Sequence, residues 1–435
     1  MKKTLLLSVA ASAMLMAGGD IAPVVETEVA PAPSEFLIFN NIYAKGEIRP
    51  RYEFVDVDDS LTTNKSDANA FTNRLMLGIG ADFMQIDGLS VYLEGTNVVG
   101  TGDFFSLSAD DLNNNIYEVV ADPDQTRITQ AYMDYKFGDT LIRAGRQGVN
   151  LDNQRFIGTV NWRQMPQTYD AVAVINNSVE NLNLLAAYVW RVNTIFDQNT
   201  IKPVGNDFDT NSVLLHAAYT FMPELTLTGY GYLLQDIHDT YGIAATGKVD
   251  AGFGKISYRA EYATQTDPSI EDLTTNQTAD ADYYNIEATL NANGILVGAR
   301  YEVLGAGNGT NGPFTTPLAT LHGQNGWADI FLATPWDGLV DVNGMIGYKA
   351  DGFGVAKLVY HDFSSDRNSI DYGTEVDFIY KNKIPGVKGL SGMLKASWYS
   401  TDYDSVTDTY GYAGAPLSYD TTKFWVMLDY KFSSK

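Results

Sequence analysis

The sequence has 435 residues, contains no cysteine and is poor in positive charge, with 29 Lys and Arg against 53 Asp and Glu. Without cysteine, the chain has no disulfide framework, no thiolate metal site and no cysteine nucleophile. The net charge of −24 argues against a globally basic nucleic-acid binder, because phosphate binding needs a positive face. The chain also lacks an apolar run of about 18 residues, so no transmembrane helix is expected.

Apolar and aromatic residues are abundant instead. The chain is 45% hydrophobic and 12% aromatic, with 39 Gly and 27 Tyr. This composition is too rich in core-forming residues for a disordered chain. The length would suit two or three soluble domains or one large β-structure, and the excess of Gly and Tyr favours the second.

The N-terminus has the features of a secretory signal peptide. Lys2 and Lys3 precede an apolar run from Leu5 to Ala17, which is too short to span a membrane. We expect cleavage after Ala17, and since no cysteine follows, no lipid anchor. The next segment, 18–40, is acidic and rich in proline, which predicts an extended periplasmic tether.

From Asn41 onward, side-chain polarity alternates with a period of two. Every odd position in 45–53 is charged, while apolar side chains occupy the opposite face. In the terminal segment 422–432, alternate positions are aromatic or aliphatic. Such alternation predicts β-strands with one apolar face.

Three features favour a membrane-spanning barrel over a soluble sandwich. The predicted strands are about 9–13 residues long, enough to cross a bilayer at a tilt. Aromatic residues lie near strand ends on the apolar face, as in interfacial girdles. Short and long connections alternate along the chain, except for a short connection near 237–240. The resulting prediction is an all-β, antiparallel transmembrane barrel of about 18 strands, with 16 as the alternative.

The predicted organisation places this barrel in the bacterial outer membrane, in contact with lipid and lipopolysaccharide. Its last strand resembles the signal read by the outer-membrane insertion machinery. Side chains cannot fill so wide a barrel, so we expect an aqueous lumen narrowed by an inward loop at 99–125, 148–166 or 305–338. The predicted segments are the signal peptide (1–17), the tether (18–40), the barrel (41–432) and a C-terminal tail (433–435).

Arginines are concentrated in the first part of the predicted barrel. Strict alternation puts six of them on the inward face of their strands: Arg49, Arg51, Arg74, Arg191, Arg259 and Arg300. An inward arginine can bind an anionic solute, because its guanidinium pairs with carboxylate in a bidentate manner. Alternatively it can pair with a wall carboxylate and only neutralise the wall. The pattern leaves both open, although the cluster at 143–163 has few acidic neighbours in sequence.

The same cluster carries a family likeness. Gly145-Arg146-Gln147, the run 152–158, Trp162-Arg163-Gln164 and Thr168-Tyr169-Asp170 resemble the signature of the alginate export family of outer-membrane barrels. Two further runs, 314–322 and 325–329, also resemble it. The resemblance implies 18 strands and an arginine-lined, anion-selective constriction that passes an acidic polysaccharide.

Together, the pattern and the resemblance give a set of candidate residues lining the pore or contacting substrate. Asp152 and Asn153 would shape the constriction, and the second block is expected to form a structured loop. The full set is Arg74, Arg127, Arg143, Arg146, Gln147, Asp152, Asn153, Arg155, Arg163, Arg191, Arg259 and Arg300.

Other chemistry finds little support in the sequence. The four histidines, His216, His238, His322 and His361, show no metal-binding spacing, so no metal or other cofactor is expected. No nucleophile elbow is present, so no catalytic residues and no enzyme are predicted. Acidic loops such as 103–111 do not match calcium-loop spacing and are expected to form a solvated rim.

The predicted function is a passive outer-membrane channel with an arginine-rich constriction. It would pass acidic sugars or other small organic anions. The alternative is a general or weakly cation-preferring porin in which the wall arginines are ion-paired.

Overall fold

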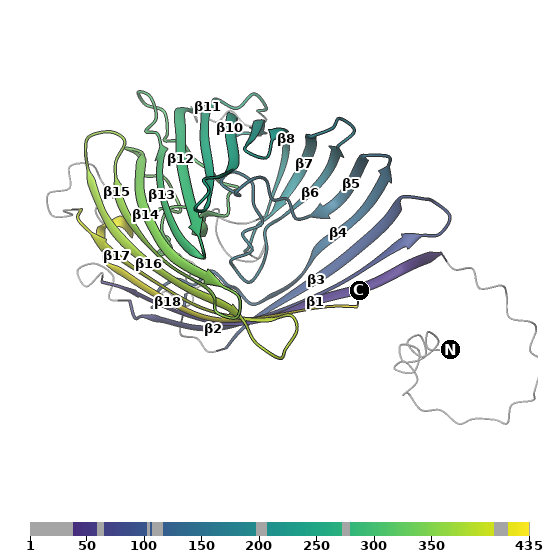
Figure 1. Ribbon diagram of the computed structural model, residues 1–435, viewed down its shortest axis with the longest axis horizontal. Helices are drawn as coiled ribbons and strands as arrows, with labels where there is room; N and C mark the ends of the chain where they lie inside the picture. The colour runs from purple at the N-terminus through teal and green to yellow at the C-terminus, as the bar shows by residue number, and fades with distance from the viewer. Residues whose placement is uncertain are drawn as a thin grey trace, which may run out of the picture. The chain divides into compact units, whose positions relative to one another are not determined.

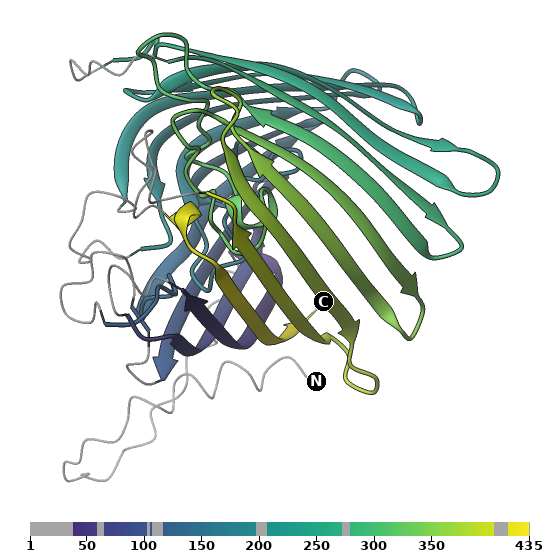
Figure 2. The same cartoon turned by 90° about the vertical axis from the view of Figure 1, so that its left-hand side faces the viewer.

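The protein forms one closed antiparallel β-barrel of 18 strands (Figures 1 and 2). The computed structural model describes residues 38–58, 65–101, 105–106, 116–196, 207–271, 279–403 and 416–434. The predicted signal peptide and most of the tether therefore lie outside the described residues. The strands are β1 (Phe39–Val57), β2 (Ala68–Phe83), β3 (Leu89–Thr101), β4 (Gln125–Phe137), β5 (Thr140–Gln147), β6 (Thr168–Asn176), β7 (Leu182–Asn193), β8 (Phe208–Met222), β9 (Leu225–Leu234), β10 (His238–Asp250), β11 (Lys255–Thr266), β12 (Asp280–Ala292), β13 (Ile295–Leu304), β14 (Leu339–Ala350), β15 (Gly354–Ser364), β16 (Asp371–Lys383), β17 (Leu390–Thr401) and β18 (Thr421–Ser433).

Each strand pairs with its sequence neighbours, and β1 closes the barrel against β18. Lys45 lies opposite Ser433, so the first and last strands meet at the end where the chain begins and finishes. The predicted 18-strand barrel is confirmed. So is the short β9–β10 connection, where Asp236 adopts a positive φ of 59°.

Alternation along the strands gives the barrel an apolar outer surface. Leu75, Leu77 and Ile79 on β2 are 39–52% exposed, whereas Arg74, which precedes Leu75, is fully buried. Phe424, Val426 and Leu428 repeat this pattern on β18. Such a continuous exposed apolar surface on a closed barrel is stable in lipid, where every backbone group must be paired within the sheet.

No described helix is long and apolar enough to cross a membrane. Within the described connections, the helical segments are two single 3-10 turns, Leu321–Gly323 and Pro416–Ser418.

The interior contains a packed core as well as polar walls. Phe156, from the β5–β6 connection, contacts Tyr230, Tyr283 and Phe314, with ring centroids 5.2–6.0 Å apart. Because these rings come from two strands and two connections, this core fixes inward-folded loops against the wall.

Candidate functional site: the barrel lumen

The β5–β6 connection, residues 148–167, crosses the lumen to the wall formed by β1 and β2. The backbone carbonyl of Asn161 accepts from Arg49 at 2.8 Å, and that of Trp162 accepts from Arg51 at 2.6 Å. The Asn161 side chain accepts from Arg74 at 2.8 Å. Wall arginines thus satisfy carbonyls of a loop that has no strand partner. The predicted inward loop at 148–166 is therefore present.

The β13–β14 connection, residues 305–338, packs on the first loop. The Gly158 N–H donates to the Leu318 carbonyl at 2.9 Å, and the Thr320 N–H donates to the Gln154 carbonyl at 3.0 Å. A Cβ at Gly158 would overlap the Thr320 hydroxyl, so the close approach requires glycine. The second loop also reaches β16, where Glu375 accepts from the Ala328 N–H at 2.9 Å.

An aromatic cage joins both loops to the wall. Lys395 on β17 lies 4.3 Å from the ring centroid of Trp162 and 3.8 Å from that of Trp327, one from each loop. Its ammonium is 2.6 Å from Nε2 of His322, whose ring stacks on Trp162 at 4.0 Å. These cation–π contacts are strong because Lys395 is only 4% exposed.

The cage fixes the charge state of His322. Its Nε2 faces the Lys395 ammonium and accepts from it, and Nδ1 is 2.7 Å from an oxygen of Asp329. Only a neutral ring with the proton on Nδ1 fits both partners. Burial, and then the nearby Lys395 and Arg163, lower the pKa of His322 to about 3 despite the opposing effect of Asp329.

All twelve arginines, which lie in described residues, form ion pairs within 4.0 Å of a carboxylate. Arg163 pairs with Glu53 and Asp329, and Arg155 pairs with Glu302. The other pairs join Arg49 to Glu47, Arg51 to Glu53 and Asp122, Arg74 to Glu47, Arg127 to Asp207, Arg143 to Asp134, Arg146 to Asp170, Arg191 to Asp209, Arg259 to Glu261, Arg300 to Glu302 and Arg367 to Asp337. Arg155 and Arg163 have few acidic neighbours in the sequence, but carboxylates from segments far along the chain pair with them in the fold.

Arg143 keeps an accessible guanidinium. Its side chain is 26% exposed and lies 3.9 Å from the ring centroid of Tyr132 on β4. Nε and Nη2 both donate to Asp134 at 2.7 Å, which leaves Nη1 for a further acceptor. Arg127 is 15% exposed and Arg163 is 10% exposed, so Arg143 is the more open of these lumenal arginines.

Two candidate arginines do not face the lumen, in contrast to the prediction from the sequence. Arg146 is next to buried Gln147 on β5 and shares its face with Ala144, so the register turns it away from the lumen. On β7 a bulge between Val189 and Arg191 shifts the phase, so that Arg191 faces away from buried Val192. The inward placement of Arg191 and the pore-lining placement of Arg146 are therefore corrected.

The remaining candidates lie within the lumen. Asp152, at a positive φ of 49°, is 3.1 Å from His216 on β8 and 3.7 Å from Arg259 on β11. Burial raises the pKa of Asp152, but the hydrogen bond and charge of His216, together with Arg259, outweigh burial and lower it. Arg300 donates to the Asn285 side chain, and Gln147 donates to the Ala171 carbonyl. The Asn153 carbonyl accepts from the Gln324 side chain.

Sequence reasoning missed the cage and the tyrosines of the wall. Tyr92 on β3 and Tyr132 are 5.4 Å apart, and the ammonium of Lys45 lies 4.4 Å from the Tyr92 centroid. Gly78 on β2 makes room, because a Cβ there would overlap the Tyr92 ring. The signal available in the sequence was the pair Gly78 and Gly80 on one face of β2, where the missing side chains leave room for the rings of Tyr92 on β3 and Tyr43 on β1. Within the described residues, no group of acidic and histidine side chains could hold a metal.

Comparison with known proteins agrees with this architecture. Residues 42–198 match the alginate export family, a range that includes the first block of the resemblance but not the block at 314–329. No curated protein sequence matches the chain.

Solved structures of outer-membrane channels share the fold. Pseudomonas aeruginosa OccK8 (OprE) superimposes with a TM-score of 0.68 at 16% identity, covering 92% of this chain and 100% of its own. P. aeruginosa OpdK, solved with vanillate, gives 0.67 at 12% identity, covering 90% and 99%. Acinetobacter baumannii OccAB4 gives 0.66 at 13% identity, covering 91% and 99%.

Proposed function

Because this chain is an outer-membrane β-barrel with an alginate export match over residues 42–198, we propose that it is a passive channel for acidic sugars or other small organic anions. The two inward loops narrow the lumen and leave arginine side chains along it. The alginate export match and the barrel fold favour a passive channel over an enzyme. OpdK, a similar barrel, was solved with vanillate, which is itself an organic anion.

The observation that carries the proposal is the accessible guanidinium of Arg143. Its contact with Tyr132 and its pair with Asp134 fix its position on the wall. A passing carboxylate can accept from Nη1 without displacing Asp134, since guanidinium offers five donors. An immobilised cation of this kind lowers the barrier for anions without trapping them.

Liposome swelling with galacturonate, glucose and glucosamine tests the proposal. Galacturonate should enter faster than glucosamine through the unaltered protein, and Arg143→Gln should reduce this ratio several-fold. Arg146→Gln is the matched control, because Arg146 lies on the same strand and pairs with Asp170 but faces away from the lumen. Faster entry of glucosamine, or equal effects of both substitutions, would contradict the proposal.

The second candidate is a general porin with a weak preference for cations. The pairing of all twelve arginines favours it, because each paired carboxylate cancels the field of its arginine. In this case galacturonate would show no advantage over glucosamine, and Arg143→Gln would leave the ratio of their entry rates unchanged.

A further inference from the structure

Most lysines of the barrel lie at one end, the end where β1 begins and β18 finishes. This is the periplasmic mouth, because the short turns and both ends of the barrel chain are on that side. Nine strand lysines there share the inward side of the wall, here named the lysine collar: Lys45, Lys136, Lys248, Lys255, Lys349, Lys357, Lys381, Lys383 and Lys431.

The inward direction follows from the alternation of each strand. Lys136 lies between Tyr135 and Phe137, whose side chains are 42% and 48% exposed on the outer surface. Lys431 likewise lies between Tyr430 and outward Phe432. Three further lysines are each adjacent to an outward residue of their strand: Lys349 to Tyr348, Lys357 to Leu358 and Lys248 to Val249. Lys381 and Lys383 are three and five positions after outward Phe378, which places them on the opposite, inward face of β16. Lys45 and Lys255 share the inward faces of Glu47 and Arg259.

The collar is poorly neutralised, unlike the arginines. Of the nine lysines, all in described residues, only Lys431 lies within 4.0 Å of carboxylates, Glu47 at 3.6 Å and Asp429 at 3.4 Å. Five carboxylates share the inward face at this end, and three of them are paired (Glu47, Asp134 and Asp429): Glu47, Asp82, Asp134, Asp250 and Asp429. Further carboxylates such as Asp87 and Asp351 lie in the turns beyond the strands. The wall of the mouth therefore has a net positive charge although the chain is strongly acidic.

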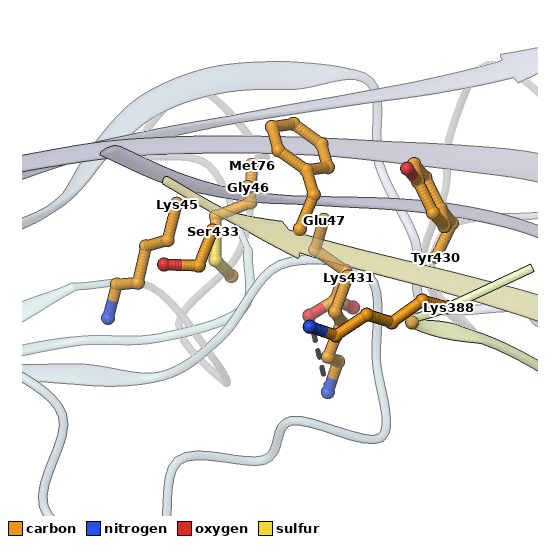
Figure 3. Close-up of a pocket in the computed structure, with 10 residues that line it drawn as sticks. Lys45, Gly46, Glu47, Met76, Lys388, Tyr430, Lys431 and Ser433 are labelled. Carbon is orange, nitrogen blue, oxygen red and sulfur yellow. Dashed lines mark ion pairs between the residues drawn. The ribbon is translucent and has the colours of Figure 1, made fainter. Parts of the chain in front are cut away.

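Three lysines converge beside the β1–β18 closure (Figure 3). Lys45, Lys388 and Lys431 line one pocket with Glu47 and Met76. The side chains of Lys45, Glu47 and Lys431 point to one side of the sheet, and that of Tyr430 points to the other. The two nearby carboxylates, Glu47 and Asp429, both pair with Lys431, whereas Lys45 and Lys388 lie within 4.0 Å of no carboxylate among the described residues, which leaves positive charge for an anion.

From Lys45 the cations continue around the wall to Arg143. Lys45 lies over Tyr92, Arg143 lies over the neighbouring ring of Tyr132, and the two rings are 5.4 Å apart. The collar therefore adjoins Arg143 on the wall formed by β1 to β5. Among the described residues at the opposite end of the strands, no comparable group of lysines lines the wall.

We propose that the lysine collar is an anion-capture site at the periplasmic mouth, with its tightest point at Lys45, Lys388 and Lys431. It concentrates solutes that carry a carboxylate or a phosphate on the periplasmic side of the channel. A charged entrance with low-dielectric walls raises the association rate of oppositely charged solutes. This inference deepens the proposed function, on which it rests, by giving the channel a preferred side for anion entry.

Single-channel recording in oriented bilayers tests the inference, with galacturonate or glucose 6-phosphate added to one side and glucose as the neutral probe. The measured quantity is the rate of current interruptions caused by each probe. We expect both anions to interrupt current more often from the periplasmic side. The triple variant Lys45→Gln, Lys388→Gln, Lys431→Gln should lower this rate on the order of tenfold. A larger effect for one probe would identify carboxylate or phosphate as the preferred group.

The triple replacement by arginine at the same positions is the matched control and should retain the asymmetry, because it keeps the charge. At about 1 M salt, where the Debye length is about 3 Å, the asymmetry should disappear. Equal interruption from both sides, or an unchanged rate in the glutamine variant, would overturn the inference. The proposed function is tested independently, because it is contradicted if the unaltered channel prefers cations. Even then, the glutamine variant would reveal the collar by shifting the selectivity of the channel further toward cations.

Discussion

His322 shows how single side chains hold the constriction together. Its ring accepts from Lys395 and donates to Asp329, so the packed loop tolerates only the neutral form. Burial raises the pKa of Asp329, but His322, Lys423 and Arg163 outweigh burial and keep it well below its usual value. The pair therefore adds one negative charge, which Lys423 and Arg163 offset at 3.1 and 3.3 Å.

The fixed neutral state of His322 predicts a pH dependence. In the unpacked loop the imidazole takes up a proton near pH 6.5, but the packed ring resists protonation until about pH 3. The contribution of His322 to the stability of the packed loop should therefore be lost as pH falls from 6.5 toward 3. Open-channel current noise should rise over this range. His322→Gln, which cannot titrate, should remove this component, and an identical response in that variant would contradict the assignment.

The cage around Lys395 gives a second prediction at the residue scale. Lys395→Met keeps the length of the side chain but removes the charge held by the Trp rings, a contact of about 2 kcal/mol when desolvated. The two loops should become less firmly attached, with larger current noise and a higher mean conductance. Lys357→Met, an inward lysine outside the cage, should leave the noise unchanged. Unchanged current noise and mean conductance in Lys395→Met would show that the cage does not hold the loops in place.

At the scale of elements, the two inward loops act as one unit. Gly158 and Thr320 are in direct contact between them, and a Cβ at position 158 would overlap the Thr320 hydroxyl. Gly158→Ala should therefore loosen the contact between the two loops and increase the open-channel current noise. Gly323→Ala is the matched control, because a Cβ at that position of the second loop meets no atom within 4 Å. Equal noise in the two variants would contradict the tight contact between the loops.

The strands could be predicted from sequence, but their faces only in part. Continuous alternation around Lys45 and Phe424 was enough for strand positions and barrel closure. The bulge at Val189–Arg191 could not be seen, because one extra residue reverses the faces without changing composition. Arg143 and Arg146, three residues apart, cannot share a strand face, and this signal was present in the sequence.

The ion pairs could not be predicted at all. Arg163 and Glu53 are 110 positions apart, and Arg163 and Asp329 are 166 apart. Their contact depends on where the loops fold, which strand periodicity does not specify. Counting the acidic residues close to each arginine in the sequence therefore gave too few ion pairs.

At the scale of the whole molecule, charge is divided between regions. The net charge of −24 combines a positive periplasmic wall, paired charges in the constriction and acidic residues in the external connections. The apolar outer surface accounts for the aromatic and aliphatic excess without requiring a large soluble core. Under the proposed function, selectivity depends on the few lumenal cations that remain accessible, above all Arg143.

The zero-current potential across a bilayer with a salt gradient tests the central claim most directly. With potassium chloride at unequal concentrations, an anion-preferring channel gives a potential displaced toward the chloride equilibrium value. We predict that displacement for the unaltered protein and a smaller one for Arg143→Gln. A potential displaced toward the potassium equilibrium value would contradict the account.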